Sequence, residues 1–179
     1  HPPYGPSIEF HLTYRQRSEQ VHDASTYGFG PKWTSNWSSY LQQSDSNGNM
    51  VAFLPGGERE THYLNAATGQ FDRQKRSLST LVQTSSSPVV YELRYPDGSK
   101  SVFSRSVGTG VFPKILLTSM SDAQGNTITL SYEDGSNRLT AVTDALGQTS
   151  NFSYEMLYPF NHLVTKISDP FIPVGGIRR

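Results

Sequence analysis

Leu117-Thr-Ser-Met-Ser-Asp122 is the stretch that decides the fold, because the chain repeats its pattern twice more. The copies are Leu139-Thr-Ala-Val-Thr-Asp144 and Val164-Thr-Lys-Ile-Ser-Asp169. The step from the first Asp to the second is 22 residues and the next step is 25, a period that is typical of stacked supersecondary units. The additional residues of the longer step fall between Tyr154 and Val164, so we expect a loop there.

Each unit contains a turn that begins at its Asp. Asp122 and Gly125 in the first unit correspond to Asp144 and Gly147 in the second, at the same spacing of three. An Asp side chain can bond the backbone two residues later, and Gly adopts a positive φ without a Cβ clash. The sequence therefore predicts equivalent turns with positive φ at both glycines. Asp169 begins a third copy, but Ile172 stands where the turn glycine is expected.

Polar and apolar residues alternate after each turn, which predicts β-strands. Leu130 and Tyr132 fall on one face of the first strand, and Phe152 and Tyr154 repeat this pattern in the second. Because a unit of this size must bury its apolar face against its neighbour, we expect the two tyrosines to lie in register on one face. The same argument places Leu130 above Phe152 and predicts a parallel column of Met120, Val142 and Ile167.

One spacing does not fit a regular strand. Leu117 and Met120 are three residues apart, as are Leu139 and Val142, so regular strands would place the members of each pair on opposite faces. A bulge, or burial on both faces, would explain the spacing, and the sequence does not choose between them.

The composition excludes several classes of function. The 15 Lys and Arg residues balance 15 Asp and Glu residues, so no global basic field is available to hold nucleic acid. The absence of Cys rules out disulfides and a thiol nucleophile. The sequence has no apolar run near 18 residues and begins without Met, which predicts a processed or excised chain with no membrane-spanning segment. Low charge, at 17%, together with 12% aromatic residues is typical of extracellular β proteins.

The first part of the chain predicts further antiparallel hairpins. Residues 8–14 alternate like an amphipathic strand with one buried face. Residues 37–41 are expected to pair with 50–54 across an Asn-Gly turn, and a second hairpin is expected near residues 61–71. The clearest hairpin joins residues 89–95 to 99–103 across Pro-Asp-Gly. Residues 74–83 fit either a short strand or a helix.

We interpret the chain as one continuous architecture in two sections. Residues 1–110 form a Gly- and Trp-containing hairpin section, and residues 111–179 form the repeat section. The expected fold class is all-β, with antiparallel hairpin repeats forming a twisted, solenoid- or shell-like sheet.

Most candidates for a chemical site have a simpler structural explanation. The segment that begins at Asp45 resembles the start of a calcium loop, but Met50 and Gly56 occupy positions that need Gly and Glu. Neighbouring carboxylates at Glu58 and Glu60, or at Glu133 and Asp134, are expected to be solvated in turns. No two histidines stand at a spacing typical of metal ligands: His1, His11, His22, His62 and His162. We therefore predict no catalytic, metal or cofactor site.

Aromatic residues and two sequons remain as candidate surface features. Trp33, Trp37 and Tyr40 could bind a glycan if they formed an exposed row, whereas packing in the core would favour a scaffold. Asn36 and Asn151 begin glycosylation sequons, which matter only in a source that has the machinery.

The repeat section resembles the Rhs or YD-repeat family. Residues Arg138-Leu-Thr140, Thr143-Asp144 and Gly147 match its motif, whereas its Tyr-Asp pair is replaced by Tyr132-Glu-Asp134 and Tyr154-Glu155. A weaker resemblance extends to residues 27–33, which are similar to the Gly/Trp-rich segment that often precedes such repeats. The resemblance implies a β shell in large secreted or surface proteins that can hold a toxic C-terminal domain, with no catalytic residues in the repeats.

Two hypotheses follow for the function. The first is a non-catalytic scaffold segment of a secreted or surface, bacterial Rhs-like protein that encloses or displays a partner or toxin domain. In this hypothesis the structural residues of the repeat are Asp122, Gly125, Tyr132, Leu139, Asp144, Gly147, Tyr154 and Asp169. The second is a glycan- or protein-binding module that uses exposed aromatics. Other segments of a longer chain, or copies of this one meeting at exposed sheet edges, are the expected partners.

Overall fold

The computed structural model describes residues 5–6, 8–14, 16, 29, 32–155 and 163–169. This part of the chain is all β, with a single 3-10 turn, η1 (Pro55–Gly57), and no α-helix. The strands are β1 (Leu12–Tyr14), β2 (Trp33–Ser35), β3 (Tyr40–Gln43), β4 (Met50–Phe53), β5 (Arg59–His62), β6 (Leu64–Asn65), β7 (Gln70–Phe71), β8 (Thr80–Ser86), β9 (Val89–Arg94), β10 (Lys100–Val107), β11 (Lys114–Ser121), β12 (Thr127–Tyr132), β13 (Leu139–Thr143), β14 (Thr149–Tyr154) and β15 (Val164–Ser168).

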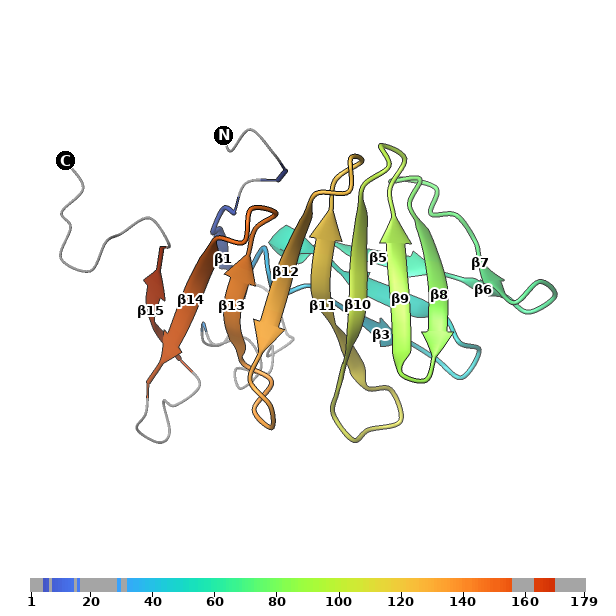
Figure 1. Cartoon of the computed structure of the whole chain (residues 1–179). Coiled ribbons are helices and arrows are strands. Elements are labelled where there is room, and N and C mark those ends of the chain that lie inside the picture. Colours follow the sequence, from blue (N-terminus) through green and yellow to red (C-terminus); the bar gives the residue numbers. More distant parts are fainter. Residues whose placement is uncertain are drawn as a thin grey trace.

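Strands β8 to β15 form a twisted antiparallel meander in which each strand pairs with its neighbours in sequence (Figure 1). The predicted hairpin across Pro-Asp-Gly is its β9–β10 pair. The three copies of the repeated hexapeptide pattern fall on β11, β13 and β15, and the Asp of each copy directly follows its strand. The prediction of an all-β fold made of sequential antiparallel hairpins is confirmed. The sheet is not closed, because β15 and β8 lie at its two ends, and a solenoid is not observed.

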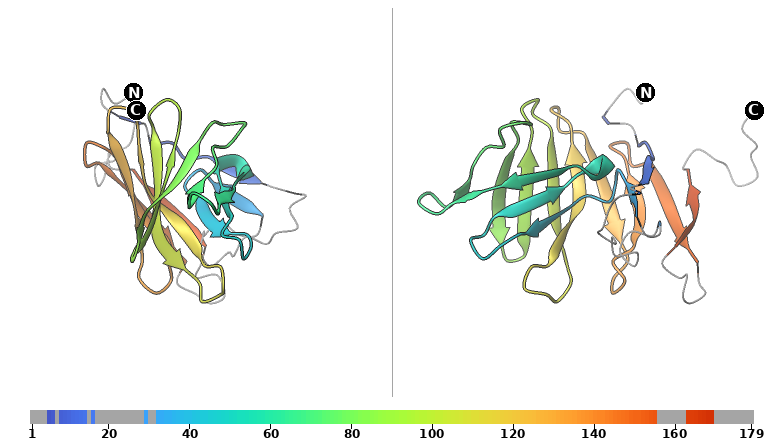
Figure 2. Two further views of the ribbon diagram at one scale, coloured as in Figure 1. Left: turned by 90° about the vertical axis from the view of Figure 1, so that its right-hand side faces the viewer. Right: turned by 180° about the vertical axis from the view of Figure 1, so that it is seen from behind.

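Strand β11 divides the sheet into two layers. Its first residues, Lys114 to Leu116, pair with β3, whereas its last residues, Ser119 to Ser121, pair with β12. Strands β3, β4 and β5 therefore fold over the meander as a second layer that crosses its strands, as Figures 1 and 2 show. Ile115, Leu116 and Leu117 are buried in succession, which is expected where a strand is covered on both faces.

The main core lies between the two layers. It combines residues of β3 and β4 with the inward faces of the meander strands. Leu41, Leu93, Phe103 and Val142 are among its fully buried members. On the other side of β11, Leu116 and Tyr40 form a smaller cluster.

The repeated Leu-Thr dipeptides form β-bulges. Ser131 pairs with Ala141 and Tyr132 pairs with Leu139, so Thr140 has no partner in the ladder. The register shifts in the same way around Thr165 and around Thr118. The additional residue of the bulge shifts the alternation of side chains by one position. Leu139 and Val142 therefore both point inward and are buried in one core. Of the two explanations for the three-residue spacing, the structure therefore shows the bulge.

The turns after the repeated Asp residues have the predicted geometry. Gly125 has φ of 88° and Gly147 has φ of 81°, which confirms the prediction. Gly125 N–H donates to the carbonyl oxygen of Asp122 over 3.1 Å, and Gly147 N–H donates to that of Asp144 over 3.0 Å. Gly98 in the β9–β10 hairpin makes the same bond to Tyr95 over 3.1 Å, with φ of 88°. This hairpin is thus built like the repeats, which the sequence did not reveal.

Three predictions about the first section need correction or refinement. The amphipathic strand expected over residues 8–14 is reduced to β1, which pairs only with β2. Leu12 and Tyr14 are 46% and 52% exposed, since this small ladder is not part of the main sheet. The hairpin expected near residues 61–71 is the short β6–β7 pair. A helix over residues 74–83 is wrong, because Leu78 has φ of 59° and β8 begins at Thr80.

Candidate functional site

In each of the two repeats, a tyrosine hydroxyl bonds the last strand of the hairpin to the first, β12 to β11 and β14 to β13. The hydroxyl of Tyr132 donates to the carbonyl oxygen of Leu117 over 2.6 Å, and that of Tyr154 donates to the carbonyl oxygen of Leu139 over 2.7 Å. Both rings pack against the main core, which confirms that the tyrosines lie in register on one face. Burial raises the pKa of Tyr154 to about 12 and raises that of Tyr132, so both phenols are protonated donors at neutral pH.

The bulge threonines make a second repeated contact. The hydroxyl of Thr140 donates to the carbonyl oxygen of Ser131 over 3.1 Å, and that of Thr165 donates to Ser153 over 3.2 Å. Thr118 makes the corresponding bond to Val102 over 3.2 Å. At each of these bulges, the threonine hydroxyl thus gives a backbone carbonyl of the partner strand a hydrogen bond where the ladder is interrupted.

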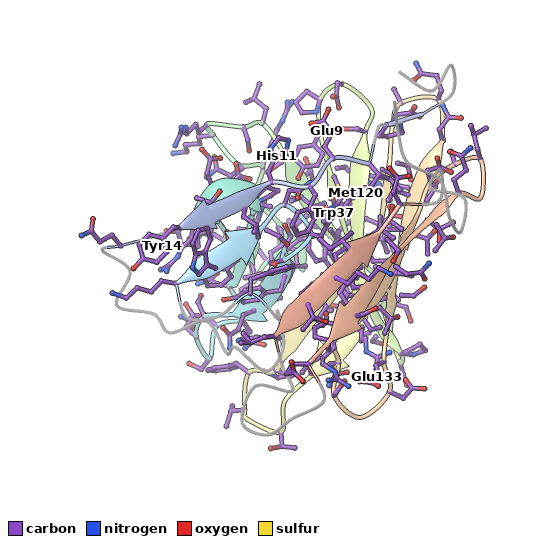
Figure 3. The ribbon with its side chains drawn as sticks, turned by 90° about the vertical axis from the view of Figure 1, so that its left-hand side faces the viewer. Glu9, His11, Tyr14, Trp37, Met120 and Glu133 are labelled. Atoms are coloured by element: carbon purple, nitrogen blue, oxygen red, sulfur yellow. The ribbon has the colours of Figure 1, made fainter. Side chains whose placement is uncertain are left out.

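An arginine covers each tyrosine ring. The guanidinium of Arg105 lies 5.7 Å from the centre of the Tyr132 ring, and that of Arg138 lies 4.9 Å from the centre of the Tyr154 ring. Both distances are within the range of cation–π attraction. Arg138 Nε also donates to a carboxylate oxygen of Glu133 over 2.8 Å, and Glu133 lies at the lower end of the sheet in Figure 3.

Arg105 is a structural residue that the sequence analysis missed. Its guanidinium donates to the carbonyl oxygen of Glu133 over 3.0 Å and to Oδ1 of Asn137 over 2.8 Å. It comes from β10, outside the repeated pattern, and no spacing in the sequence marked it. The bulge threonines did have a signal, since Thr follows Leu or Val in every copy of the pattern.

Each residue of the apolar column predicted for the repeats, Met120, Val142 and Ile167, is directly opposite another apolar residue in a ladder. Met120 pairs with Ile128, Leu130 with Val142, and Ile167 with Phe152; pairs directly opposite share a face. Val142 is fully buried, whereas Ile167 is 40% exposed, because β15 is an edge strand with a neighbour on one side only. Asp169 follows β15, as Asp144 follows β13, but the turn expected after it lies outside the described residues.

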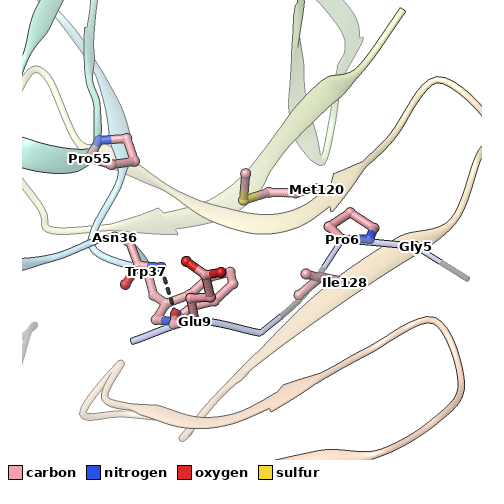
Figure 4. Close-up of a pocket in the computed structure, with 8 residues that line it drawn as sticks. All are labelled: Gly5, Pro6, Glu9, Asn36, Trp37, Pro55, Met120 and Ile128. Atoms are coloured by element: carbon pink, nitrogen blue, oxygen red, sulfur yellow. Dashed lines mark hydrogen bonds between the residues drawn. The ribbon is translucent and has the colours of Figure 1, made fainter. Parts of the chain in front are cut away.

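A pocket of about 440 Å³ opens on the inner face of the repeats (Figure 4). Trp37, Met120 and Ile128 line it together with Glu9 and Asn36. Asn36 Nδ2 donates to the carbonyl oxygen of Glu9 over 2.8 Å and so fixes the first segment against the turn after β2. The indole N–H of Trp37 is buried without an acceptor among the described residues.

The candidate aromatic residues do not form an exposed row. Trp37 and Tyr40 are 5% and 4% exposed, Trp37 because it fills the main core and Tyr40 because its ring stacks on Phe53 at 4.3 Å. Trp33 is 37% exposed and packs against Tyr14 with the ring centres 5.1 Å apart. Whether Trp33 binds a ligand stays a prediction.

The candidate metal-binding residues have structural contacts. Oδ1 of Asp45 accepts hydrogen bonds from the N–H groups of Asn47 and Asn49 over 3.0 and 3.2 Å. These bonds, together with one from the Asn49 side chain, hold the pKa of Asp45 below its usual value. Within the described ranges, no three His, Asp or Glu side chains come together in a way that could hold a metal ion.

His62 is the unusual ionisable residue of this fold. Its side chain is fully buried and neither ring nitrogen has a hydrogen-bond partner among the described residues. Nε2 lies 3.9 Å from a carboxylate oxygen of Glu60, which accepts a hydrogen bond from Ser79 over 3.0 Å. Desolvation lowers the pKa of His62, although the Glu60 carboxylate acts in the opposite direction. His1, His22 and His162 lie outside the described residues.

The two sequons differ in their surroundings. The Asn36 side chain is engaged at both ends, since its Oδ1 also accepts a hydrogen bond from the N–H of His11 over 3.0 Å. Asn151 is exposed on β14. Glycosylation of either residue stays an open prediction.

Comparison with known proteins identifies the repeat section. No curated protein matches the chain. The described residues include no helix that is long and apolar enough to cross a membrane. Residues 116–154, which run from β11 to the end of β14, match the family model described as RHS Repeat. This segment, which contains Leu-Thr bulges, Asp-x-x-Gly turns and tyrosine bonds, is similar to the RHS repeat family.

Proposed function

We propose that this chain is a non-catalytic scaffold segment of a larger secreted or surface RHS-like protein. In this proposal its sheet forms part of a β shell that encloses or displays a partner or a toxin domain. RHS repeat proteins are typically found at the cell surface or secreted, and we extend this to a bacterial source.

The observation that carries the proposal is the bond between a tyrosine hydroxyl and a leucine carbonyl 15 residues earlier, which occurs in both complete repeats. Each such bond closes one hairpin, β11–β12 or β13–β14, and the β12–β13 ladder joins the two hairpins, so the same pattern can extend the sheet by any number of units. The side chains that recur in the two complete repeats are used for turns, bulges and ring packing. They support a role in building sheet rather than in chemistry.

The free edge at β15 supports the further proposal that the isolated chain associates with itself. Among the described residues, Val164 to Ser168 pair on one side only, and the Ile167 side chain is 40% exposed. An unpaired strand edge presents N–H and C=O groups to another chain. Sedimentation velocity at several concentrations tests this: a dimer or filament is expected, and a monomer at every concentration would exclude it.

The scaffold proposal is tested first by the sequence that follows Arg179 in the source gene. Further repeats that end in an unrelated domain are expected, and an open reading frame without further repeats would overturn the shell. The second test uses the full-length protein and limited proteolysis of that unrelated domain. Replacing Tyr132 and Tyr154 by Phe should speed its cleavage, whereas Tyr63→Phe, at a side chain that is 60% exposed, should not. Equal cleavage rates in all three proteins would contradict enclosure.

A further inference from the structure

A polar cleft of about 680 Å³ lies beside β8, the strand at the opposite end of the main sheet from the repeat strand β15. Strands β8 and β9 form one side of it, and the β6–β7 hairpin forms the other. Three glutamines reach it from separate elements, Gln43 from β3, Gln70 from β7 and Gln83 from β8. We call it the glutamine cleft after these three residues. Its volume is in the range of ordinary small-ligand sites.

Two of the three glutamine amides of the cleft are held in place by one hydrogen bond each and keep further hydrogen-bonding capacity. Gln43 Nε2 donates to the carbonyl oxygen of Asp45 over 2.7 Å, and Gln83 Nε2 donates to that of Ser85 over 3.3 Å. A carboxamide has two N–H donors and an acceptor oxygen, so each of these side chains keeps one donor and its acceptor for a ligand. The side-chain amide of Gln70 makes no hydrogen bond to another described residue, and Gln70 is exposed.

Two aromatic rings provide an apolar surface beside the amides. Phe71 and Tyr91 line the cleft with ring centres 6.3 Å apart and their planes at 63°. Both are half-buried against the main core, which fixes the rings and leaves part of each facing the cleft. Tyr91 is directly opposite Gln83 in the β8–β9 ladder, so a phenol and an amide lie side by side. Burial raises the pKa of Tyr91, which keeps its hydroxyl neutral and able to donate.

The cleft is close to neutral. Among the described residues that line it, Arg94 alone carries a charge. Its guanidinium donates twice to one carboxylate oxygen of Glu92, over 2.9 and 2.7 Å. Glu92 also pairs with Lys100 over 2.8 Å, so it offsets the charge of Arg94 in part. A single, already paired cation offers little attraction to a phosphate, an acidic peptide or a nucleic acid.

We propose that the glutamine cleft binds a neutral oligosaccharide. Sugar hydroxyls both donate and accept, which matches fixed carboxamides and a neutral phenol, and the C–H faces of a sugar ring pack on aromatic surfaces such as Phe71 and Tyr91. A hydrocarbon ligand would leave the glutamine amides unpaired. A cationic ligand would find no counter-charge among the described lining residues, and an anionic one would find only Arg94, which is already paired with Glu92. This site is separate from the candidate row at Trp33, Trp37 and Tyr40, and it does not depend on the scaffold function.

The test is a titration of the whole chain with neutral tetrasaccharides, followed by two-dimensional NMR of the backbone and glutamine side-chain amides. Gluco, galacto, manno and N-acetylglucosamine tetramers serve as probes. Saturable shifts of the Gln70 and Gln83 side-chain amides with at least one probe are expected. Gln83→Ala and Gln70→Ala should each weaken binding about tenfold, the effect of losing one or two good hydrogen bonds.

Gln124→Ala is the matched control, because Gln124 is an exposed glutamine in the turn after β11 and should leave binding unchanged. Gln70 and Gln83 are exposed, so unchanged urea unfolding of their variants would show that lost binding is not lost folding. Tyr91→Phe should weaken binding several-fold without changing the fold. The proposal is overturned if no probe causes saturable shifts, if shifts appear only near Trp33, or if an extended peptide at β8 binds and the sugars do not.

Discussion

The repeat strands and the second layer are held in the sheet by different kinds of contact. Strands β11 to β14 follow one another in sequence, and each ladder joins two strands that only a short turn or loop separates. The β3–β5 layer joins the same sheet only where β3 pairs with β11, for example Leu41 with Ile115. The first arrangement can be extended by repeating a local pattern, whereas the second needs two segments far apart in sequence to meet and bury a shared core.

This difference has a consequence for the pocket and the cleft. Both lie where residues of the first section face the meander: Trp37 faces Met120 in the pocket, and Gln43 and Gln70 face the β8–β9 pair in the cleft. The repeat strands alone present an outward face of small polar residues, such as Thr129, Ser131 and Ser153. The regular part of the molecule therefore builds the sheet, and the irregular part creates its concave surfaces.

The largest expected effect breaks the contact between the layers. Leu41→Ala should lower the free energy of unfolding by about 3 kcal/mol, because Leu41 is fully buried between β11 and the main core and its truncation leaves a cavity. Urea unfolding measures this. Leu146→Ala, in an exposed turn position, should change stability by less than about 0.5 kcal/mol.

Hydrogen exchange of the same variant shows whether the two regions unfold together. In Leu41→Ala, the amides of Val142 and Phe152 should lose protection along with those of β3 and β4, because all of these strands contribute to one core. Unchanged protection of the repeat strands would mean that the repeats form a separate folding unit.

The next effect concerns the turns of the repeats. Gly125→Val and Gly147→Val should each cost more than about 1 kcal/mol, because a β-branched residue is strained at positive φ. Space is not limiting, since a Cβ at either position would meet nothing within 4 Å. Gly110 also has open space but no positive φ, so Gly110→Val is the matched control in urea melts. Equal stability of the turn and control variants would show that the turns tolerate other residues.

A smaller effect is expected from the tyrosine hydroxyls. Tyr132→Phe and Tyr154→Phe should each cost about 1 kcal/mol, the net value of a hydrogen bond that leaves a partly buried carbonyl with one partner fewer. Tyr63→Phe, at an exposed side chain, should have no measurable effect. If all three variants melt alike, the tyrosine bond within each repeat hairpin contributes nothing to stability.

The smallest expected effect is a pH dependence in the second layer. The pKa of His62 is lowered in the folded protein by burial, while in the unfolded chain it is about 6.5. The unfolded state then binds more protons as the pH falls, so the stability that His62 contributes is present above about pH 6.5 and is lost as the pH falls toward the folded pKa. Glu60 is the charged group that faces the ring, at 3.9 Å.

The measurement compares unfolding free energies at several pH values from about 7.5 down to about 5.5. His62→Leu should be less sensitive to acid than the unchanged protein. Leu146→Ala, at an exposed position without an ionisable group, should keep the original slope. The same slope in all three proteins would place the acid sensitivity in the carboxylates instead.

The sequence by itself determined the local architecture of the repeats. The Asp-x-x-Gly spacing specifies a turn that needs positive φ, and alternation up to Tyr132 and Tyr154 specifies which face of each strand is buried, because both depend on residues that are neighbours along the chain. The departure from alternation between Leu117 and Met120 showed where a ladder would be irregular. It did not show that the irregularity is a bulge, since that depends on the register of the partner strand.

Only the tertiary structure decided how the two sections meet. The division of β11 between β3 and β12, the ring of Tyr132 beneath Arg105, and the burial of Trp37 and His62 each require contacts between residues that are tens of positions apart. Turn propensity and alternation describe a residue's immediate neighbours, and they contain no term for a partner so far away. The glutamine cleft has the same origin, because its three amides come from strands that no local pattern connects.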